Sequence, residues 1–414
     1  ARIRFALCDA RLLDELEQAC RSAMEVVRIL PFNVPGSLAE RGEDSLESLL
    51  EQVVPEGGGF AAHAARPDDP ALIAFTSGTT GIPKASVHTH RDILAICDAF
   101  PVAALQPRPD DVFCGVSPLG FTYGLGGLLC FPLRYGASSL LLERTTPQAM
   151  LAAMERHQVT VCFGVPTFWR QMSGLLAQEG ASLPYLRRCV SAGEPLPEAT
   201  RTLWREVSGL EIIDGLGSTE LLHIFVSHAP GQARQGAVGY AMPGYTLRIF
   251  DAGGNALPSG QPGQLAVQGV TGCRYLDDER QSSYVRSGWN LTGDTGFLDE
   301  SGYFHFHARN DDIIVSSGYN IAGPEVEAAL LEHPAVLECG VVGIPDAVRG
   351  QIVKAFVILR AGFASDTVLA AAIQEFVKAR IAPYKYPRVI EFVESLPRTE
   401  TSKLQRYRLR AGPI

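Results

Sequence analysis

The sequence lacks paired cysteines, long apolar runs and an excess of basic charge. Its nine cysteines are scattered singly, from Cys8 to Cys339, with no C-x-x-C pair. Disulfide frameworks and zinc sites normally use paired spacing, so we expect reduced thiols and a cytoplasmic location. No apolar stretch reaches membrane-spanning length and no signal peptide opens the chain, so we expect no membrane partner. A net charge of −9 argues against nucleic acid as a partner.

Three familiar motifs are also missing. No G-x-S-x-G elbow is present, which argues against a serine hydrolase, and neither "GLGST" nor "GLGG" completes a dinucleotide fingerprint. The glycines and hydroxyls of "TSGTTGIPK" (76–84) suit a phosphate, because backbone N–H groups can approach the anion closely. A P-loop, however, needs Gly-Lys-Ser/Thr at its end, and here Pro83 precedes Lys84 and Ala85 follows it. The segment is therefore a different nucleotide loop or only a turn.

Alternating apolar and amphipathic segments predict an α/β fold. At 414 residues the chain exceeds what one hydrophobic core usually supports, so we expect at least two domains. Thr146 and Pro147 begin a predicted helix at 146–158. The predicted strands, two of which run on into glycine-rich loops, lie at 139–144, 159–166, 186–197 and 210–220. Such alternation favours largely parallel sheets with ligands beyond the carboxyl ends of the strands.

The texture changes twice along the chain. Residues 231–306 read as a β-rich subdomain of short alternating strands separated by Gly, Pro and Asn turns. After the polar stretch 309–312 a small α/β unit is predicted. Its expected helices lie at 323–336 and 367–381, and its expected strands at 338–346 and 354–360. The chain opens directly in a predicted strand and helix, without an initiator methionine.

Several polar residues have both a chemical and an ordinary interpretation. Glu220 could hold a divalent cation through its carboxylate oxygens, or be a solvated loop residue. Asp294 and Arg309 could clasp a ribose and a phosphate, or belong to a hairpin. Lys403 lies in a polar loop, where a lone lysine is usually solvated. Taken singly, these residues leave both readings open.

The ordered set of segments is more specific than any one of them. The segments are "FTSGTTGIPK" (75–84), "SAGEPLP" (191–197), "DGLGSTE" (214–220), "LTGD" (291–294), "SSGYNIAGPEVE" (316–327) and "PRTETSK" (397–403). In this order they resemble the core motifs of the adenylate-forming superfamily, which contains acyl- and aryl-CoA synthetases, luciferases and adenylation domains. The resemblance implies a large AMP-binding domain (1–310) of mixed and parallel sheets and a small, mobile α+β C-terminal domain (311–414).

The resemblance also implies an activity and its residues. A carboxylate would attack ATP to form an acyl-adenylate, and coenzyme A would then displace AMP. Lys403 would stabilise the charge between carboxylate and phosphate, Thr219 would contact the α-phosphate, and Glu220 would bind Mg²⁺. The residues expected around ATP or AMP are Thr76, Ser77, Gly78, Thr79, Thr80, Gly81, Lys84, Ala192, Gly193, Glu194, Pro195, Asp214, Gly215, Leu216, Gly217, Ser218, Asp294, Arg309 and Asn320.

The same resemblance assigns the second half-reaction. Asp311 aligns with the hinge about which the C-terminal domain rotates. After rotation, Ser317, Gly318 and Tyr319 would line the pantetheine tunnel of coenzyme A. One site would thus be used twice, which keeps water from a reactive mixed anhydride.

The acyl group is expected to be aromatic, because the segments 117–127 and 218–225 most resemble benzoate and 2-aminobenzoate ligases. Phe121 and Tyr123 would wall a flat ring beside Ile224, and Gly124 and Gly217 would leave room for it. His223 would either hydrogen-bond an ortho amino group or be a packed histidine without substrate contact.

Departures from the family pattern, among them Ala308 and Ser402 in place of the usual glycines, qualify these expectations. Leu216 stands where many relatives place an aromatic residue over adenine. The family's N-terminal portion is missing, so we expect either a partial chain or a genuine truncation. The sequence leaves two alternatives to an AMP-forming aryl-acid–CoA ligase. One is an enzyme that loads an aryl group onto a carrier-protein thiol, and the other is a shortened nucleotide-binding paralogue. A homodimer is left open.

Overall fold

The structure is a computed structural model that describes residues 3–23, 27–34, 45–52, 62–76, 83–398 and 404–411. The chain divides into two compact units, residues 1–65 and residues 66–414. Sequence patterns indicated no division near residue 65. Within the described residues, none of the helices combines the length and apolar character that crossing a bilayer requires.

The first unit contains a two-stranded parallel sheet and short helices. Its elements are β1 (Phe5–Asp9), η1 (Ala10–Leu12), α1 (Leu13–Ala23), β2 (Arg28–Phe32) and α2 (Leu46–Gln52). The Asp9 carboxylate accepts a 2.9 Å hydrogen bond from the Arg11 amide and so caps the turn that leads into α1. The predicted opening strand and helix are confirmed.

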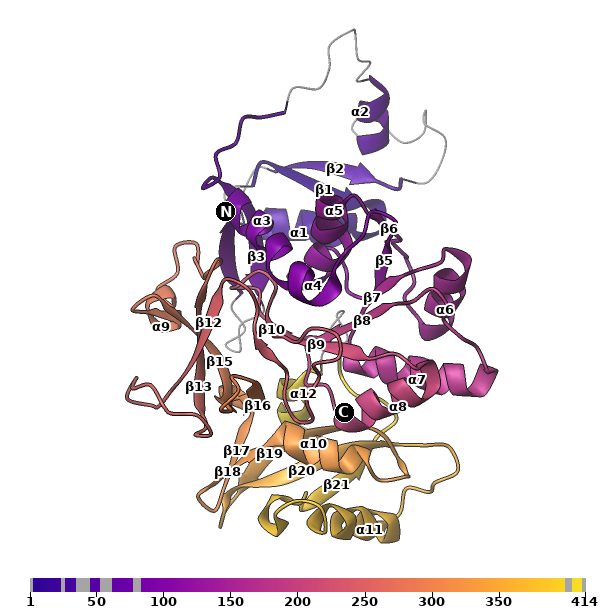
Figure 1. Cartoon of the computed structure of the whole chain (residues 1–414), viewed down its shortest axis with the longest axis vertical. Helices are drawn as coiled ribbons and strands as arrows, with labels where there is room; N and C mark the ends of the chain where they lie inside the picture. Colours follow the sequence, from indigo (N-terminus) through magenta and orange to yellow (C-terminus); the bar gives the residue numbers. More distant parts are fainter. Residues whose placement is uncertain are drawn as a thin grey trace. The chain divides into compact units, whose positions relative to one another are not determined.

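A seven-stranded sheet forms the centre of the larger part of the second unit (Figure 1). It follows a hairpin of β3 (Pro70–Thr76) and β4 (Lys84–Thr89). Its order is β11-β10-β9-β8-β7-β5-β6, in which β5 to β9 are parallel, β10 is antiparallel to β9, and β11 is antiparallel to β10. The strands are β5 (Val112–Gly115), β6 (Ser138–Ser139), β7 (Val161–Gly164), β8 (Arg188–Ala192), β9 (Ile212–Gly217), β10 (Ile224–Ser227) and β11 (Tyr240–Ala241). The expected parallel α/β sheet is confirmed.

Helices cover both faces of this sheet because its strands are apolar on both sides. Val161 and Phe163 of β7 pack in one core with Phe100, whereas Cys162 packs in the other with Trp169. The helices are α3 (His90–Asp98), η2 (Pro101–Leu105), α4 (Thr122–Leu125), η3 (Gly126–Cys130), α5 (Phe131–Tyr135), α6 (Pro147–Arg156), α7 (Pro166–Glu179) and α8 (Glu198–Ser208). The Thr146 hydroxyl accepts a hydrogen bond from the Ala149 amide, as expected for the cap of α6.

The predicted strand at 139–144 is wrong for most of its length. Strand β6 contains only Ser138 and Ser139, at the edge of the sheet. Leu140 and Leu142 instead pack against the core cluster that contains Trp169. The apolar character of 139–144 therefore comes from side chains that pack beside the edge of the sheet. These residues do not form a longer strand.

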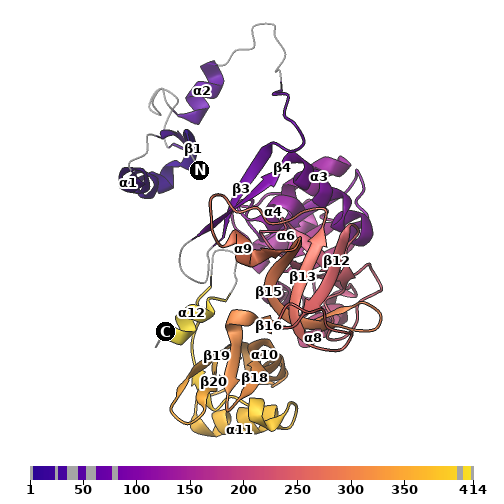
Figure 2. The same ribbon diagram turned by 90° about the vertical axis from the view of Figure 1, so that its left-hand side faces the viewer.

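The β-rich region is an antiparallel sheet, as predicted. Figure 2 shows β12, β13 and β15 side by side. The elements are β12 (Tyr245–Phe250), β13 (Gly263–Gly269), α9 (Gln281–Tyr284), β14 (Val285–Arg286), β15 (Trp289–Leu298) and β16 (Phe304–Arg309). Strand β16 ends at Arg309 and is followed by η4 (Asn310–Asp312), where the hinge was predicted.

The last part of the chain has its own sheet and its own cores. The elements are β17 (Ile313–Ser316), β18 (Tyr319–Ala322), α10 (Gly323–Leu331), β19 (Val336–Asp346), β20 (Gly350–Leu359), α11 (Thr367–Lys378), η5 (Pro383–Lys385), β21 (Val389–Phe392) and α12 (Arg406–Ala411). Val341 and Ala355 pack with residues of α10 and α11. The neighbouring Val342 and Phe356 pack with Leu409 of α12. Since successive strand residues face opposite ways, α12 covers the other face of the sheet. The boundary at 310/311 itself remains a prediction.

Candidate active site

The two ends of the predicted phosphate loop are joined in a hairpin. Thr76 ends β3, Lys84 begins β4, and the two residues are Cα partners across the pair. Ser77, Gly78, Thr79, Thr80 and Gly81 lie outside the described residues, as does Lys403. Their predicted roles therefore stay predictions.

A tyrosine that sequence reasoning missed joins Lys84 to Glu220. The Tyr275 hydroxyl donates a 2.7 Å hydrogen bond to Glu220 Oε1, and Lys84 Nζ lies 3.4 Å from the same hydroxyl. Burial, followed by the Glu220 charge, raises the pKa of Tyr275, so the phenol stays protonated and donates. Residues 274–276 run beside β4, with Val87 N donating to Arg274 O at 2.7 Å and Leu276 N to Ala85 O at 2.9 Å. No motif in "CRYLDD" marked this tyrosine.

A tight turn after β9 holds Thr219 and Glu220. The Leu222 amide donates to Thr219 O at 3.1 Å, and Leu222 has a positive φ of 70°, which is strained for a side-chain-bearing residue. His88 Nε2 lies 2.8 Å from the same Thr219 carbonyl and so must donate to it. Burial lowers the pKa of His88, so this donor is neutral. The histidine anchors the turn from the neighbouring hairpin.

The side chain of Asp214 is used inside the fold. Its carboxylate accepts from the Gly215 amide at 3.0 Å and lies 3.5 Å from Arg201 Nη2. Burial raises its pKa to about 7, and the Arg201 charge opposes that rise. Gly215, Leu216 and Gly217 pair with β10 as strand residues, with Ser218 just beyond the strand. Any nucleotide contact by residues 214–218 remains a prediction.

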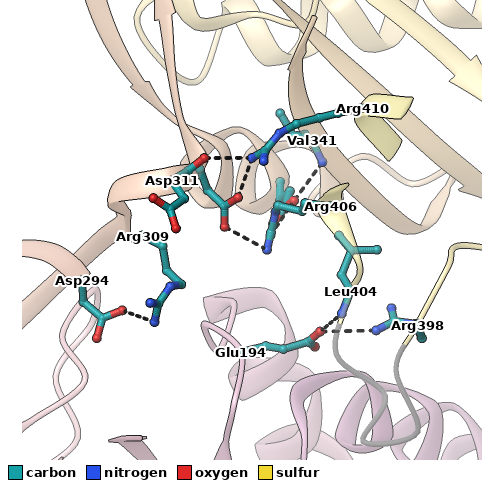
Figure 3. Close-up of polar contacts among 11 residues, drawn as sticks. Glu194, Asp294, Arg309, Asp311, Val341, Arg398, Leu404, Arg406 and Arg410 are labelled. Carbon is teal, nitrogen blue, oxygen red and sulfur yellow. Dashed lines mark hydrogen bonds and ion pairs between the residues drawn. The ribbon is translucent and has the colours of Figure 1, made fainter. Parts of the chain in front are cut away.

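Asp294 and Arg309 are brought together as predicted. They are directly opposite each other in β15 and β16, and Arg309 Nη1 donates to Asp294 Oδ1 at 3.3 Å (Figure 3). The Asp294 side chain is 5% exposed and that of Arg309 is 50% exposed. The pair therefore has a shielded acceptor and a cation open to solvent.

The loop after β8 contains Ala192, Gly193, Glu194 and Pro195. Gly193 has a φ of 91°, a conformation that glycine adopts without strain. The Glu194 carboxylate turns to the C-terminal tail, where Oε1 accepts from Leu404 N at 2.8 Å and from Arg398 Nη1 at 3.4 Å (Figure 3). The sequence predicted this loop to lie around ATP or AMP, mainly through its backbone, and gave no sign of the Arg398 contact.

The predicted coenzyme A residues form the turn of the β17–β18 hairpin. Ser317 and Gly318 both have positive φ, 51° and 82°, as the primed two-residue turns require. Tyr319 stacks on Tyr384 at 4.4 Å between ring centroids. Asn320 follows in β18. Asp311 lies in η4, where its carbonyl accepts from Arg410 Nη2 at 3.1 Å.

His223 lies in an aromatic cage at the predicted acyl pocket. Its ring is 5.8 Å or less from those of Phe100, Tyr123 and Phe131, and its exposed fraction is 3%. Burial lowers its pKa to about 3, so the imidazole is neutral. Nε2 lies 3.3 Å from Tyr123 O and must donate to that carbonyl, which leaves Nδ1 as an acceptor. Nδ1 has no partner among the described residues.

The prediction that Gly124 and Gly217 leave room for the substrate's ring is wrong. A side chain at Gly124 would meet Ser117 O at 2.5 Å and Pro118 O at 2.2 Å, and one at Gly217 would meet His223 O at 2.7 Å. Backbone fills both spaces. Gly126 instead makes room for the ring of His223 itself, because a side chain there would meet His223 Cδ2 at 2.3 Å.

The remaining acyl-pocket residues differ in exposure. Phe121 is 42% exposed and precedes α4, whereas Ile224 is 2% exposed and belongs to the core. The Tyr123 hydroxyl donates to Gly164 O at 2.9 Å, so this ring is fixed at the end of β7. A separate polar cavity of about 340 Å³ lies beside Asp92, Cys273 and Asn290 and is lined by none of the predicted site residues.

Comparison with known proteins decides the family. Residues 1–274 match the family model described as AMP-binding enzyme, and residues 325–403 match that of its C-terminal domain. The chain belongs to the AMP-binding enzymes. It has the adenylate-forming fold, with a large AMP-binding domain and a C-terminal domain, and falls among the AMP-forming acid–CoA ligases.

Three relatives illustrate the range of named substrates. This AMP-binding enzyme is 38% identical to benzoate–CoA ligase of Thauera aromatica over 375 residues, 90% of this chain and 71% of that protein. It is 38% identical to the mitochondrial acyl-coenzyme A synthetase ACSM3 of Homo sapiens over 354 residues, 82% of this chain and 59% of that protein. The crystal structure of the anthranilate CoA ligase AuaEII with anthranoyl-AMP superposes with a TM-score of 0.91 at 33% identity, covering 99% of this chain and 78% of that one.

Proposed function

We propose that this AMP-binding enzyme is an aryl-acid–CoA ligase that forms an aryl-adenylate from ATP and transfers the aryl group to coenzyme A. The observation that carries the proposal is the chain of contacts Lys84–Tyr275–Glu220, 3.4 and 2.7 Å long. It brings the cation that closes the predicted phosphate loop beside the carboxylate predicted to bind a divalent ion. Family membership supports the same chemistry.

In the first half-reaction the substrate carboxylate oxygen attacks the α-phosphorus of ATP. The bond from that phosphorus to the bridging oxygen breaks, and pyrophosphate leaves with the bond electrons. Both reactants are anions, so the reaction needs cations placed where charge spreads in the transition state. Lys84 would hold the departing phosphates, and Lys403 would stabilise the carboxylate against the α-phosphate.

Mg²⁺ is the expected companion of ATP in this step. Glu220 fits it, because carboxylate oxygens are hard ligands and Tyr275 engages only Oε1. A bound ion would neutralise phosphate charge. The chain's own part is to fix Glu220 through Tyr275, and to fix the adjoining Thr219 carbonyl through His88.

The Asp294–Arg309 pair suits the nucleoside part of ATP. Asp294 is shielded, and a buried carboxylate binds hydroxyl donors strongly. It would accept from the ribose hydroxyls, while the half-exposed Arg309 would face the phosphate side.

In the second half-reaction the thiol of coenzyme A attacks the carbonyl carbon, loses its proton and expels AMP.

The aromatic cage supports an aryl acid, and its histidine supports 2-aminobenzoate over benzoate. A buried acceptor without a partner costs about 1–3 kcal/mol. An ortho amino group could donate to Nδ1 of His223 and recover that cost once the ring lies against the cage. Benzoate has no such donor. A packed histidine without substrate contact is the alternative outcome.

Coenzyme A is proposed as the acceptor, in preference to a carrier-protein thiol, on the names of the relatives that match most of this chain. A cytoplasmic location is proposed on the nine free cysteines.

A carboxylate panel tests the function. The protein is supplied with ATP, Mg²⁺, coenzyme A and, in turn, benzoate, 2-aminobenzoate, malonate and a medium-chain fatty acid, and AMP and thioester are measured together. We expect both products with the aromatic acids. Thioester from the fatty acid or malonate alone would reject the aryl assignment, and AMP without thioester would reject coenzyme A as acceptor.

A further inference from the structure

One carboxylate of the large domain binds the residues on either side of segment 399–403, which contains Lys403. Glu194 Oε1 accepts from Arg398 Nη1 at 3.4 Å and from the Leu404 amide at 2.8 Å (Figure 3). Arg398 and Leu404 also form an antiparallel bridge with each other. A single side chain therefore fixes both the entry and the exit of this segment.

The contact is shielded from water. The side chains of Glu194 and Arg398 are 17% and 23% exposed. Arg398 Nη2 donates to Glu338 Oε2 at 2.9 Å, so the guanidinium lies between two carboxylates. Burial raises the pKa of Glu194, and the Arg398 charge opposes that rise. A shielded charged pair of this kind costs much more to break by removing one partner than an exposed pair does.

The hydrogen bond to Leu404 acts next to the reactive residue. The Leu404 nitrogen is part of the peptide bond whose carbonyl carbon belongs to Lys403. The contact therefore holds the chain at the residue that directly follows Lys403 in the sequence. Glu194 itself follows β8, in the loop that was predicted to lie around ATP or AMP.

A second set of contacts holds the tail to its own domain. Arg406 Nη2 donates to Glu327 Oε2 at 2.7 Å, and Arg406 Nη1 lies 3.9 Å from Asp312 Oδ2. Arg410 Nη2 donates to Asp312 Oδ1 at 2.5 Å, beside the predicted hinge. All of these partners lie beyond residue 311, so they would move with the tail in a rotation of the C-terminal domain. The Glu194 contacts would have to break.

We propose that Glu194 is a positioning residue for the first half-reaction. Its carboxylate holds the base of the lysine segment beside the nucleotide site while the adenylate forms, and it releases Arg398 and Leu404 before thioester formation. The inference rests on the proposed function for the role of Lys403. The contacts themselves do not depend on which acid is the substrate.

Glu194→Gln tests the role, because glutamine keeps an acceptor for Leu404 but loses the charge that binds Arg398. We expect adenylate formation, measured as pyrophosphate release, to fall about tenfold, the equivalent of about 1.4 kcal/mol. Thioester formation from supplied aryl-adenylate should stay within twofold of the wild type. Glu206→Gln, the same change at an exposed site of the large domain, should leave both rates unchanged. Equal loss of both half-reactions in Glu194→Gln, or no loss of adenylation, would overturn the proposal.

A double-mutant cycle separates this role from general destabilisation. If Glu194 acts through Arg398, then Glu194→Gln combined with Arg398→Gln should slow adenylation no more than the slower single variant does. Additive losses would count against the pair. Glu327→Gln provides the contrast, because it loosens the tail from its own domain and should lower the thermal midpoint and slow both half-reactions.

Hydrogen exchange gives a reading that needs no substrate. In Glu194→Ala the Leu404 amide loses its acceptor, so a peptide that begins at least two residues before Leu404 and ends by residue 411 should exchange faster than the same peptide in wild type and in Glu206→Ala. Unchanged exchange would reject the Glu194 contact even if the aryl assignment holds. If the wild type activates no carboxylate, the function fails separately and this measurement still decides the contact.

Discussion

The Tyr275 hydroxyl donates a 2.7 Å hydrogen bond to the Glu220 carboxylate across 55 residues of sequence. The same hydroxyl lies 3.4 Å from Lys84 Nζ. The tyrosine thus links the strand that follows the predicted phosphate loop to the turn that presents the proposed magnesium ligand. It sets the relative position of two groups that the chemistry must bring together.

Tyr275→Phe should slow adenylate formation about tenfold, because a hydrogen bond to a charged group contributes about 1.5–3 kcal/mol. The Mg²⁺ concentration needed for half-maximal rate should rise, since Glu220 is no longer held. The measurement is pyrophosphate release against Mg²⁺ concentration. Tyr407→Phe, at an exposed tyrosine, is the matched control. An unchanged Mg²⁺ dependence would separate Tyr275 from the metal role.

Lys403→Ala should largely abolish adenylate formation from acid and ATP. Without the lysine, no cation on this segment stabilises the negative charge that the carboxylate and the α-phosphate bring together in the transition state. Thioester formation from supplied aryl-adenylate should be spared. Separate assays of the two half-reactions measure this, with Lys378→Ala, at a half-buried lysine of α11, as control. Equal loss of both steps would contradict the assigned role.

Asp311→Pro should slow thioester formation more than adenylate formation. Proline fixes φ near −65°, and a hinge has to change its backbone angles. Asp311→Ala keeps that freedom and serves as control in the same two assays. If the thioester step in Asp311→Pro matched that of the alanine variant, rotation about this residue would be wrong.

His223→Phe should reduce the use of 2-aminobenzoate about tenfold while benzoate use stays within twofold. Phenylalanine keeps the packing against Phe100 and Phe131 but removes the Nδ1 acceptor. The comparison is of kcat/KM for the two acids. Parallel losses for both acids would assign the histidine to packing alone.

Asp214→Asn should change how stability depends on pH. Burial raises the pKa of Asp214 to about 7 from an ordinary 3.8. A carboxyl with a raised folded-state pKa stabilises the native state fully below its unfolded pKa, and this contribution is lost as pH rises through about 7. The wild type should therefore lose thermal stability relative to the variant between about pH 4 and pH 7. Thermal midpoints of both proteins across this range measure it, and a constant difference would show that Arg201 already cancels the burial cost.

Local patterns were enough to predict several elements of this protein. Helix α6 follows from the Thr146 cap and its apolar spacing, and β12 and β13 lie inside the predicted β-rich region 231–306. The prediction failed at 139–144, where an apolar run packs beside a sheet edge. Periodicity reports which side chains are buried, but it does not report whether the backbone has a strand to pair with.

The sequence by itself determined the family and the order of its motifs, because glycine, hydroxyl and carboxylate residues at fixed spacing are a property of the chain. Only the tertiary structure decided which of these residues meet. Arg398 and Glu194 are 204 residues apart in sequence, Tyr275 carried no motif, and the space beside Gly124 is filled by backbone. Such contacts depend on how sheets and loops pack, and no local pattern of residues encodes that packing.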